Sequence, residues 1–265
     1  MITKEFTCKT AMSPSKLPGL DYSLNPYRGC EHNCAYCYAP SMLKIRRNEW
    51  GSSVYIKKNI PLVLSKELKK KKKGVVGIST VTDSYQPIEK KYQLTRYCLE
   101  QLLSYDFPIS IQTKSSLVER DIDLISKFSN NEVIITISTL NDKERKLIEP
   151  NSSPIKNRLE ILKKVEESGI PSSVFFGPIY PTISKDEIPI IIDTFIESGA
   201  NKIWIDSLHL KIGAWGEIKK NILHNEKMYK TFLKNLFENK KYYKELREEI
   251  INIAKKKNIK IIDAF

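Results

Sequence analysis

Residues 28–38 read Arg28-Gly29-Cys30-Glu31-His32-Asn33-Cys34-Ala35-Tyr36-Cys37-Tyr38, and this stretch places three cysteines in one short loop. Thiolates are the usual ligands of iron–sulfur clusters, and the spacing Cys-x3-Cys-x2-Cys lets one loop supply three corners of a cubane. A fourth protein ligand is missing nearby, and an iron without one can bind a small molecule. The spacing therefore predicts a [4Fe–4S] cluster on Cys30, Cys34 and Cys37, with one iron open to an organic ligand.

Zinc is the alternative metal, because His32 lies inside the same loop and could complete a Cys3His set. Structural zinc sites usually take their ligands as two pairs separated by a dozen or more residues. Convergence of all four groups from one short loop would strain it, so the ligand geometry favours the cluster. Cys8 and Cys98 lie outside the loop; Cys98 fits a small buried core residue, and a chemical role for either stays open.

The composition is that of an ordinary globular protein. The chain has 265 residues, 41% of them apolar and 28% charged, which is enough for one large domain. No apolar run approaches the length needed to cross a bilayer, and residues 1–7 carry an acid and lack the apolar stretch of a secretory signal. We therefore expect a cytoplasmic protein with no membrane partner, in a compartment where thiols stay reduced.

The net charge of +13 has two interpretations. Clustered Lys and Arg attract nucleic acid by neutralising its phosphates. A lysine-rich composition spread over solvated helix surfaces gives the same charge, and much of the excess falls in residues 69–73, 240–241 and 255–257. Lys is also favoured over Arg here, whereas specific phosphate clamps tend to use Arg. Charge alone thus leaves a nucleic-acid partner open.

Short apolar runs alternate with longer amphipathic stretches, which is typical of successive βα units. A first strand is expected around residues 22–28, before the cysteine loop. Further strands are expected at 75–79, 109–113, 133–138, 173–177 and 202–206, with helices at 61–72, 88–104, 117–128, 154–168 and 185–198. Residues 219–257 fit a charged, largely helical stretch, followed by a possible added strand at 259–262. The pattern predicts an α/β fold, a partial (β/α)6 TIM-like barrel of parallel strands with a C-terminal helix extension.

Three regions are expected: an N-terminal segment (1–20), the barrel core (21–210) and a C-terminal helical extension packed on the core (211–265). Chemistry in (β/α) barrels lies at the C-terminal ends of the strands. The cysteine loop belongs at this end, so polar residues after the other strands should surround it. Lys114 ends the third strand and can direct a cation into the site or merely cap the strand; its position favours the first reading.

Two other pairs of residues each allow two interpretations. Arg145 and Glu149 are four residues apart, which allows an ion pair on one helix face as readily as contact with a cofactor. Asp206 and His209 follow the sixth strand and are candidates for substrate contact, although a lone His is as often structural.

The cysteine loop resembles the signature of the radical S-adenosylmethionine (radical SAM) superfamily, Cys-x3-Cys-x-aromatic-Cys, with Tyr36 at the aromatic position. Four further segments resemble the spore photoproduct lyase-like branch of that superfamily, whose members are often labelled DNA repair photolyases. These segments are Asn25-Pro26-Tyr27-Arg28-Gly29-Cys30, Thr82-Asp83 with Tyr85-Gln86-Pro87, Thr113-Lys114, and Glu149-Pro150. The resemblance extends from about Asn25 to the sixth strand.

This resemblance implies an enzyme with two cofactors, a [4Fe–4S] cluster and S-adenosyl-L-methionine, that generates a 5′-deoxyadenosyl radical for hydrogen abstraction. It implies a flavodoxin- or ferredoxin-like electron donor and, together with the charge, a possible nucleic-acid substrate. Lys114 and Ser138 match positions that contact S-adenosylmethionine in true lyases. Thr82 and Asp83 stand where many members carry a Gly-Gly-Glu-like segment that contacts the methionine amine, and they are the best polar substitutes there.

One departure limits what the resemblance transfers. True spore photoproduct lyases carry a hydrogen-donating cysteine near the end of the second strand, whereas this chain reads Ser79-Thr80-Val81-Thr82 there. Cys98, in the next helix, would have to point inward to replace it. The substrate, the exact reaction and the catalytic residues therefore stay unassigned. The competing class is a non-enzymatic, zinc-stabilised nucleic-acid-binding protein.

Overall fold

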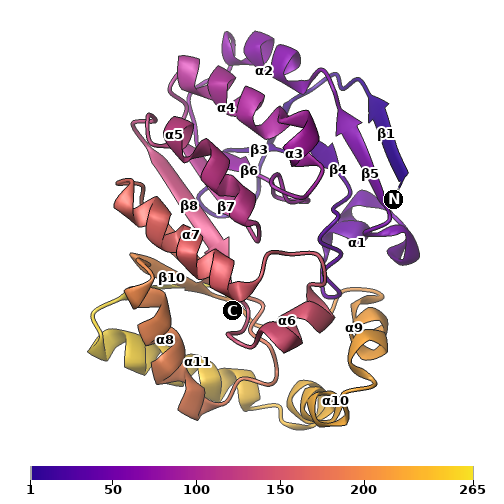
Figure 1. Ribbon diagram of the computed structural model, residues 1–265, viewed down its shortest axis with the longest axis vertical. Coiled ribbons are helices and arrows are strands. Elements are labelled where there is room, and N and C mark those ends of the chain that lie inside the picture. Colours follow the sequence, from indigo (N-terminus) through magenta and orange to yellow (C-terminus); the bar gives the residue numbers. More distant parts are fainter. Residues whose placement is uncertain (1, 265) are drawn as a thin grey trace.

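The computed structural model describes residues 2–264, and its centre is one eight-stranded sheet (Figure 1). The sheet consists of β2 (Met12–Pro14), β3 (Tyr22–Leu24), β6 (Val76–Ile78), β7 (Ile109–Thr113), β8 (Asn131–Thr136), β9 (Ser172–Phe176), β10 (Lys202–Ile205) and β11 (Lys260–Asp263). The strand order is β11-β10-β9-β8-β7-β6-β3-β2, with every pair parallel except β2 and β3. Strands β2 and β11 form the two edges, so the barrel is open, and the predicted partial parallel barrel is confirmed.

Helices connect these strands and lie outside the sheet (Figure 1). Between β6 and β10 they are α3 (Glu89–Tyr92), α4 (Leu94–Ser104), η2 (Ser116–Asp121), α5 (Ile122–Ile125), α6 (Asp142–Ile148), α7 (Ile155–Glu167), η3 (Lys185–Glu187) and α8 (Ile188–Glu197); α2 (Ile60–Leu68) precedes β6. After β10 come α9 (Ala214–Ile222), α10 (Glu226–Leu233), the π-helical η4 (Lys234–Glu238) and α11 (Tyr242–Lys256).

The two faces of the curved sheet differ in character because successive strand residues point to opposite sides. The outward residues are apolar and pack on the helices; the rings of Phe176 in β9 and Phe195 in α8 lie 5.5 Å apart between centroids. Several of the alternate residues point into the barrel and are half-buried, among them Gln112, Phe175 and Trp204, whereas Ile134 and Ser173 on the same face are buried. The inner face is therefore mainly polar or aromatic and partly open.

A second, three-stranded sheet was not expected from the sequence. It has the order β1-β5-β4, from β1 (Ile2–Phe6), β5 (Ser53–Lys57) and β4 (Tyr27–Arg28). Helix α1 (Ala39–Leu43) and the 3-10 turn η1 (Arg47–Glu49) lie between β4 and β5 in the chain. Strand β1 is exposed along its whole length, so it lacks the alternation of buried and exposed residues that would reveal a strand.

The expected first strand, 22–28, is divided between the two sheets. Residues of β3 join the main sheet, and β4 joins the small one, with Asn25 and Pro26 between them. Proline has no N–H for a ladder hydrogen bond, so the strand is interrupted there. The Asn25 side chain stabilises this change in chain direction, because its oxygen accepts hydrogen bonds from the N–H groups of Thr80 (3.0 Å) and Val81 (3.1 Å).

Most of the other predicted elements are confirmed, including the added strand, which is β11. The expected helix 88–104 is instead two helices, α3 and α4, because Gln93 between them has a φ of +50°. The expected helix 117–128 begins as the 3-10 helix η2 and continues only as the short α5. Among the helices of residues 2–264, none combines the length and apolar character needed to cross a bilayer. The expected division of the chain into three regions, residues 1–20, 21–210 and 211–265, stays a prediction.

Candidate active site

The cysteine loop runs from β4 to α1 and lies at the ends of the parallel strands. The loop after β6 holds it on one side, where the Thr82 hydroxyl donates to the Gly29 carbonyl oxygen at 2.6 Å. Gln86 accepts from the Glu31 N–H at 2.8 Å. The segment between α6 and α7 holds it on the other side, where the Asn151 amide donates to the Glu31 carbonyl at 2.8 Å. These contacts confirm that the loop belongs at the C-terminal edge of the barrel.

Arg47 fixes the middle of the loop, a role that was not predicted from the sequence. Its guanidinium donates to the carbonyl oxygens of Cys37 (2.6 Å) and Cys34 (2.9 Å), and also to that of Ala35. A planar guanidinium with several fixed N–H groups can bind several carbonyls at once, which a lysine cannot. Nothing in the local sequence distinguishes Arg47 from Arg46, which is exposed and pairs with Glu49.

Gly29 is required where the chain enters the loop. Its φ is +94°, which disfavours any residue with a Cβ, and a Cβ added there would lie 2.4 Å from the Ser53 carbonyl oxygen. The backbone of β5 therefore approaches the start of the cysteine loop closely, and this approach orients Cys30.

The three thiols form no disulfide, and Cys34 and Cys37 are close enough to Cys30 to affect its pKa. Cys30 and Cys34 are each 6% exposed, and Cys37 is half-buried. Burial is the main factor that raises the pKa of all three thiols, and the Cys34 and Cys37 sulfurs raise the pKa of Cys30 further. Thiolates at these positions therefore require a cationic partner, which the irons of a cluster would supply. The donor set fits a cluster bound at three corners.

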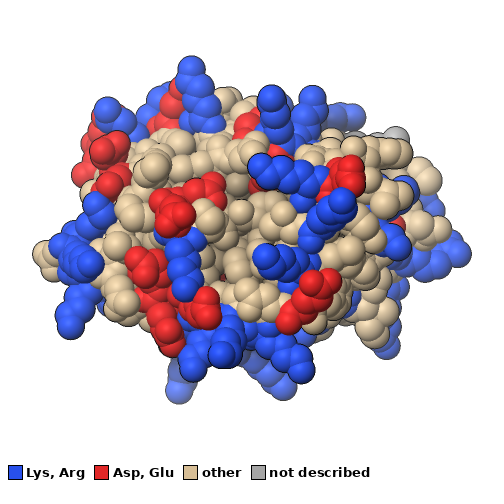
Figure 2. All heavy atoms as spheres, turned by 90° about the horizontal axis from the view of Figure 1, so that it is seen from below, with Lys and Arg blue, Asp and Glu red and all other residues tan. Residues whose placement is uncertain are grey.

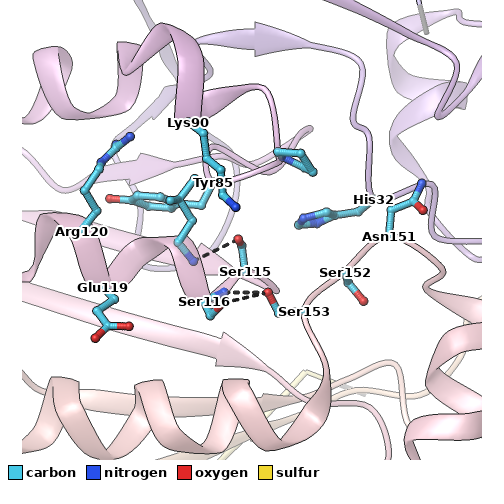
Figure 3. Close-up of a pocket in the computed structure, with 12 residues that line it drawn as sticks. His32, Tyr85, Lys90, Ser115, Ser116, Glu119, Arg120, Asn151, Ser152 and Ser153 are labelled. Atoms are coloured by element: carbon cyan, nitrogen blue, oxygen red, sulfur yellow. Dashed lines mark hydrogen bonds between the residues drawn. The ribbon is translucent and has the colours of Figure 1, made fainter.

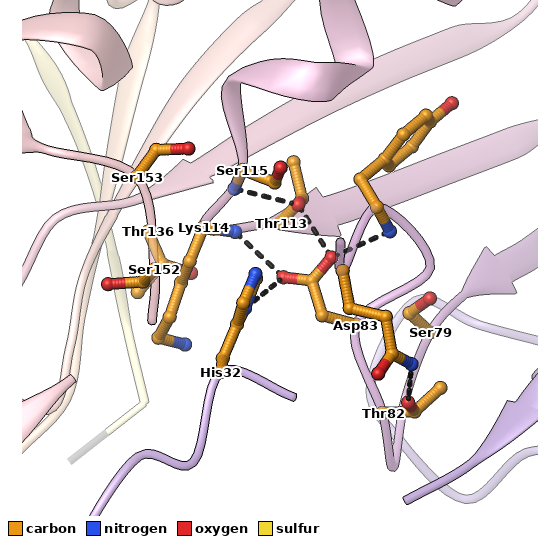
Figure 4. Close-up of polar contacts among 12 residues, drawn as sticks. His32, Ser79, Thr82, Asp83, Thr113, Lys114, Ser115, Thr136, Ser152 and Ser153 are labelled. Carbon is orange, nitrogen blue, oxygen red and sulfur yellow. Dashed lines mark hydrogen bonds and ion pairs between the residues drawn. The ribbon is translucent and has the colours of Figure 1, made fainter. Parts of the chain in front are cut away.

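The structure gives no support to the zinc alternative. His32 Nδ1 lies 3.3 Å from Asp83 Oδ2, so its ring is engaged by the loop after β6 (Figure 4). Within residues 2–264, no three His, Cys, Asp or Glu side chains are grouped closely enough to hold a single metal ion. A Cys3His tetrahedron is therefore not formed.

Asp83, a predicted cofactor residue, is the centre of a buried hydrogen-bond network (Figure 4). Its carboxylate accepts from the Thr113 hydroxyl (2.7 Å) and from the N–H groups of Tyr85 (2.9 Å) and Lys114 (2.9 Å). Burial alone would raise the pKa of Asp83, but His32 and these hydrogen bonds lower it well below its usual range. Asp83 is therefore ionised and links the cysteine loop to the end of β7.

Three predicted cofactor residues, Tyr36, Lys114 and Ser138, gather around Glu149. The hydroxyl of Tyr36 donates to the Glu149 carboxylate, and the Ser138 hydroxyl lies 3.4 Å from the same oxygen. Lys114 Nζ lies 5.7 Å from the centroid of the Tyr36 ring. Burial alone would lower the pKa of Lys114, but Cys34 and Glu149 raise it. The structure thus brings together a cation, an aromatic ring and a hydroxyl beside Cys34.

The ion pair between Arg145 and Glu149, one of the two alternatives that the sequence left open, is not formed. Arg145 pairs with Asp142, with Nε 2.9 Å from Oδ1, and donates to the Glu149 carbonyl instead of the carboxylate. Glu149 pairs with Arg158, at 2.6 Å, and both side chains are fully buried. Burial alone would raise the pKa of Glu149, but Arg158 and Lys114 lower it to about 2. Arg158 was missed as a partner because it is nine residues away, beyond helix spacing.

A pocket of about 490 Å³ adjoins the cysteine loop (Figure 3). His32 points into it from the loop, and Lys90, Ser115, Asn151 and Ser153 line it from α3, the start of η2 and the segment before α7. Within residues 2–264, the residues that line this pocket do not include a cysteine. The pocket therefore reaches the loop from the side of His32, away from the thiols.

The remaining candidates lie elsewhere. Asp206 follows β10, with Oδ1 3.3 Å from His209 Nε2, and the Ser207 hydroxyl lies 3.1 Å from the same nitrogen. Asp206 directly follows β10 and continues the inward alternation of Trp204, so it lies on the barrel side of the sheet. Cys98 is fully buried in the hydrophobic core, as the sequence predicts.

Comparison with known proteins agrees with this fold and cysteine arrangement. The family model described as "Radical SAM superfamily" matches residues 24–195, which is more than half of the chain. The chain belongs to the radical SAM superfamily, and the predicted resemblance is confirmed at that level.

Individual proteins and solved structures also resemble this chain. An uncharacterized protein of Methanocaldococcus jannaschii is 38% identical over 265 residues, which cover 96% of this chain and 93% of that protein. A spore photoproduct lyase mutant with bound AdoMet and dinucleoside spore photoproduct has a TM-score of 0.74 at 14% identity, covering 99% of this chain and 82% of that one. Streptococcus suis SuiB bound to its precursor peptide SuiA gives 0.58 at 13% identity, covering 92% and 48%. The fold is that of spore photoproduct lyase.

Proposed function

We propose that this radical SAM enzyme binds a [4Fe–4S] cluster through Cys30, Cys34 and Cys37 and cleaves S-adenosyl-L-methionine reductively. The observation that carries the proposal is the loop itself, which holds three free thiols and whose backbone carbonyls at Cys34 and Cys37 are both bound by the guanidinium of Arg47. A bound cluster would supply one electron to the sulfonium, which breaks a carbon–sulfur bond and gives methionine and a 5′-deoxyadenosyl radical. That radical would then abstract hydrogen from a substrate.

The residues around Glu149 would position the organic cofactor. No ion pair to Lys114 Nζ is formed within residues 2–264, and its raised pKa keeps it charged, so it can bind the methionine carboxylate. Ser138 is buried and its hydroxyl already contacts Glu149 and the Gly177 carbonyl, so its contact with a ribose hydroxyl stays a prediction, as does a cofactor contact of Tyr36. Thr82 and Asp83 have structural partners already, and their contact with the methionine amine stays a prediction.

We further infer that the substrate is a nucleic acid and that the enzyme acts in the cytoplasm. The net charge of +13 supports it, and the matched spore photoproduct lyase was solved with a dinucleoside photoproduct. SuiB, solved with a peptide, has the lower TM-score. Figure 2 shows Lys and Arg spread over the lower face with Asp and Glu among them. Attraction to phosphates would therefore come from the whole charge distribution, and not from a single clamp on this face.

Anaerobic reconstitution tests the cofactor assignment. The protein should take up four irons and, on reduction with dithionite, release methionine and 5′-deoxyadenosine. Cys34→Ala should abolish the release, whereas Cys8→Ala, outside the loop, should leave it unchanged. Release by the Cys34→Ala variant, or purification with a stoichiometric zinc ion and no iron uptake, would contradict the proposal.

The substrate assignment has its own test. Affinity for a single-stranded oligonucleotide should be measurable at low salt and should fall steeply as salt rises. Deuterium transfer from a labelled strand into 5′-deoxyadenosine would identify the reacting substrate. Absence of binding at low salt would remove nucleic acid from consideration and leave the cofactor chemistry intact.

A further inference from the structure

We propose that residues 38–50, here named the cap, form the docking surface for an acidic protein that donates one electron. The inference rests on the proposed function, because reductive cleavage consumes an electron that the described side chains do not supply. The donor is oxidised by one electron, the bound cluster is reduced by one, and no bond or proton is exchanged between the two proteins.

The cap covers two of the cysteines directly. Ala39 and Trp50 are buried against Cys30, and Leu43 and Ile45 pack on the same small cluster together with Cys37. This cluster is separate from the main core of the protein. The cap is therefore the layer of protein between these thiols and solvent, and a partner seated on it would lie close to them. Because electron transfer weakens steeply with distance, this is a favourable place for a donor.

Large apolar side chains are exposed on the cap and on the segment next to it. Among residues 2–264, the most exposed large apolar side chains are Ile212, at 92%, and Met42, at 68%. Met42 lies in α1, and Ile212 precedes Gly213, where an added Cβ would lie 3.7 Å from Arg47 Cγ. Figure 1 shows α9, which follows Gly213, directly beneath α1. Met is enriched in protein interfaces, so exposed Met42 within the cap, with exposed Ile212 next to the cap, indicates a protein partner.

The charge around these apolar tips is positive. Arg28, Lys44 and Arg46 are exposed, and the Arg28 guanidinium donates to the Leu43 carbonyl at 2.8 Å, which places it against α1. The acid within the cap is Glu49, and Arg46 already pairs with it. A complementary partner is therefore acidic. Phosphates would use the same cations but not the apolar tips, so the combination favours an acidic protein over a nucleic acid.

An acidic flavodoxin is the probe for the test, and the cluster-loaded full chain is the subject. The variant Lys44→Glu/Arg46→Glu should raise the dissociation constant of the flavodoxin complex, and the KM for flavodoxin in S-adenosylmethionine cleavage, about tenfold or more. Dithionite-driven cleavage should be unchanged, because a small reductant needs no docking surface. The control Lys255→Glu/Lys256→Glu makes the same charge change on exposed positions of α11 and should change none of these values.

A second variant separates the apolar contribution. Met42→Gln keeps the charge and should weaken flavodoxin binding at high salt, where ionic attraction is screened. Unchanged flavodoxin binding and KM in the double charge variant would overturn the proposal. So would a loss of oligonucleotide affinity in that variant with flavodoxin unaffected, which would assign the cap to nucleic acid. Failure of the proposed function is distinguishable, because the unmodified protein would then not cleave S-adenosylmethionine even with dithionite.

Discussion

Tyr36 and Glu149 are 113 residues apart in the sequence, and the hydroxyl of Tyr36 donates a hydrogen bond to the Glu149 carboxylate. Tyr36 lies between two of the cysteines, and Glu149 is held by the buried guanidinium of Arg158. The aromatic residue of the cysteine loop is thus anchored to the segment before α7 through a fully buried ion pair. The position of the loop therefore depends on that pair.

Removal of Arg158 should destabilise the fold strongly. Arg158→Met leaves the Glu149 carboxylate buried without its cation, and such a change costs about 3–5 kcal/mol of unfolding free energy. Urea unfolding of the cluster-free protein measures it. Lys156→Ala is the matched control, since Lys156 on the same helix makes only an exposed pair with Glu160 at 3.8 Å and should change stability little. An equal effect of the two variants would contradict the prediction.

The same pair gives the protein an acid-sensitive contribution to stability. The pKa of Glu149 falls from an ordinary 4.5 to about 2 in the folded chain, so its contribution is fully present above about pH 5. As the pH falls from about 5 towards 2, the unfolded chain takes up the proton first and about 3 kcal/mol is lost. The stability gap between the unmodified protein and Glu149→Gln should narrow over this range in urea unfolding. A gap that stays constant down to pH 3 would refute the assignment.

Gly29→Ala should impair the cysteine loop. Its φ of +94° and the 2.4 Å approach of the Ser53 carbonyl make a Cβ there costly, by about 1–3 kcal/mol. Iron bound per chain after anaerobic reconstitution should fall, and thermal unfolding should occur at a lower temperature. Gly216→Ala, within α9 where an added Cβ meets nothing within 4 Å, is the control and should not reduce iron uptake. Full iron uptake by Gly29→Ala would count against the strain argument.

Arg47→Ala should reduce the stability of the bound cluster. The variant leaves the carbonyl groups of Cys34 and Cys37 without their shared donor, so the loop loses its fixed course. We expect several-fold faster iron loss to a chelator. Arg47→Lys should retain only part of the cluster's stability towards the chelator, because one ammonium cannot reproduce the planar set of donors. Arg46→Ala, exposed and adjacent, should behave like the unmodified protein, and comparable iron loss from both alanine variants would exclude a specific role.

Lys114→Ala should weaken binding of S-adenosylmethionine to the cluster-loaded protein. Loss of a charge-assisted contact with the carboxylate is worth about 1.5–3 kcal/mol, so the dissociation constant should rise about tenfold or more. Equilibrium dialysis measures it directly. Lys90→Ala removes an exposed lysine from the neighbouring pocket and should leave the constant unchanged. An unchanged constant for Lys114→Ala would reject its role.

Features of the site that are close together in the chain were predictable. The cysteine spacing, the polar residues after strands and the parallel barrel all follow from local patterns over a few residues. The small sheet was not predictable, because β1 shows no alternation and β4 has only two residues. The roles of Arg47 and Arg158 were equally hidden, since a lone arginine carries no signal of which carbonyl or carboxylate it will meet.

The sequence by itself determined that three thiols lie together, since their short spacing keeps them in one loop whatever the rest of the chain does, and the resemblance of that loop to a known signature indicated the radical SAM class. It also determined the parallel barrel, because the order of apolar runs and amphipathic stretches leaves few ways to bury them. Only the tertiary structure decided that Glu149 pairs with Arg158 and not with Arg145, and that Arg47 holds the cysteine loop. These contacts depend on which groups are buried side by side, and burial is a property of the packed molecule.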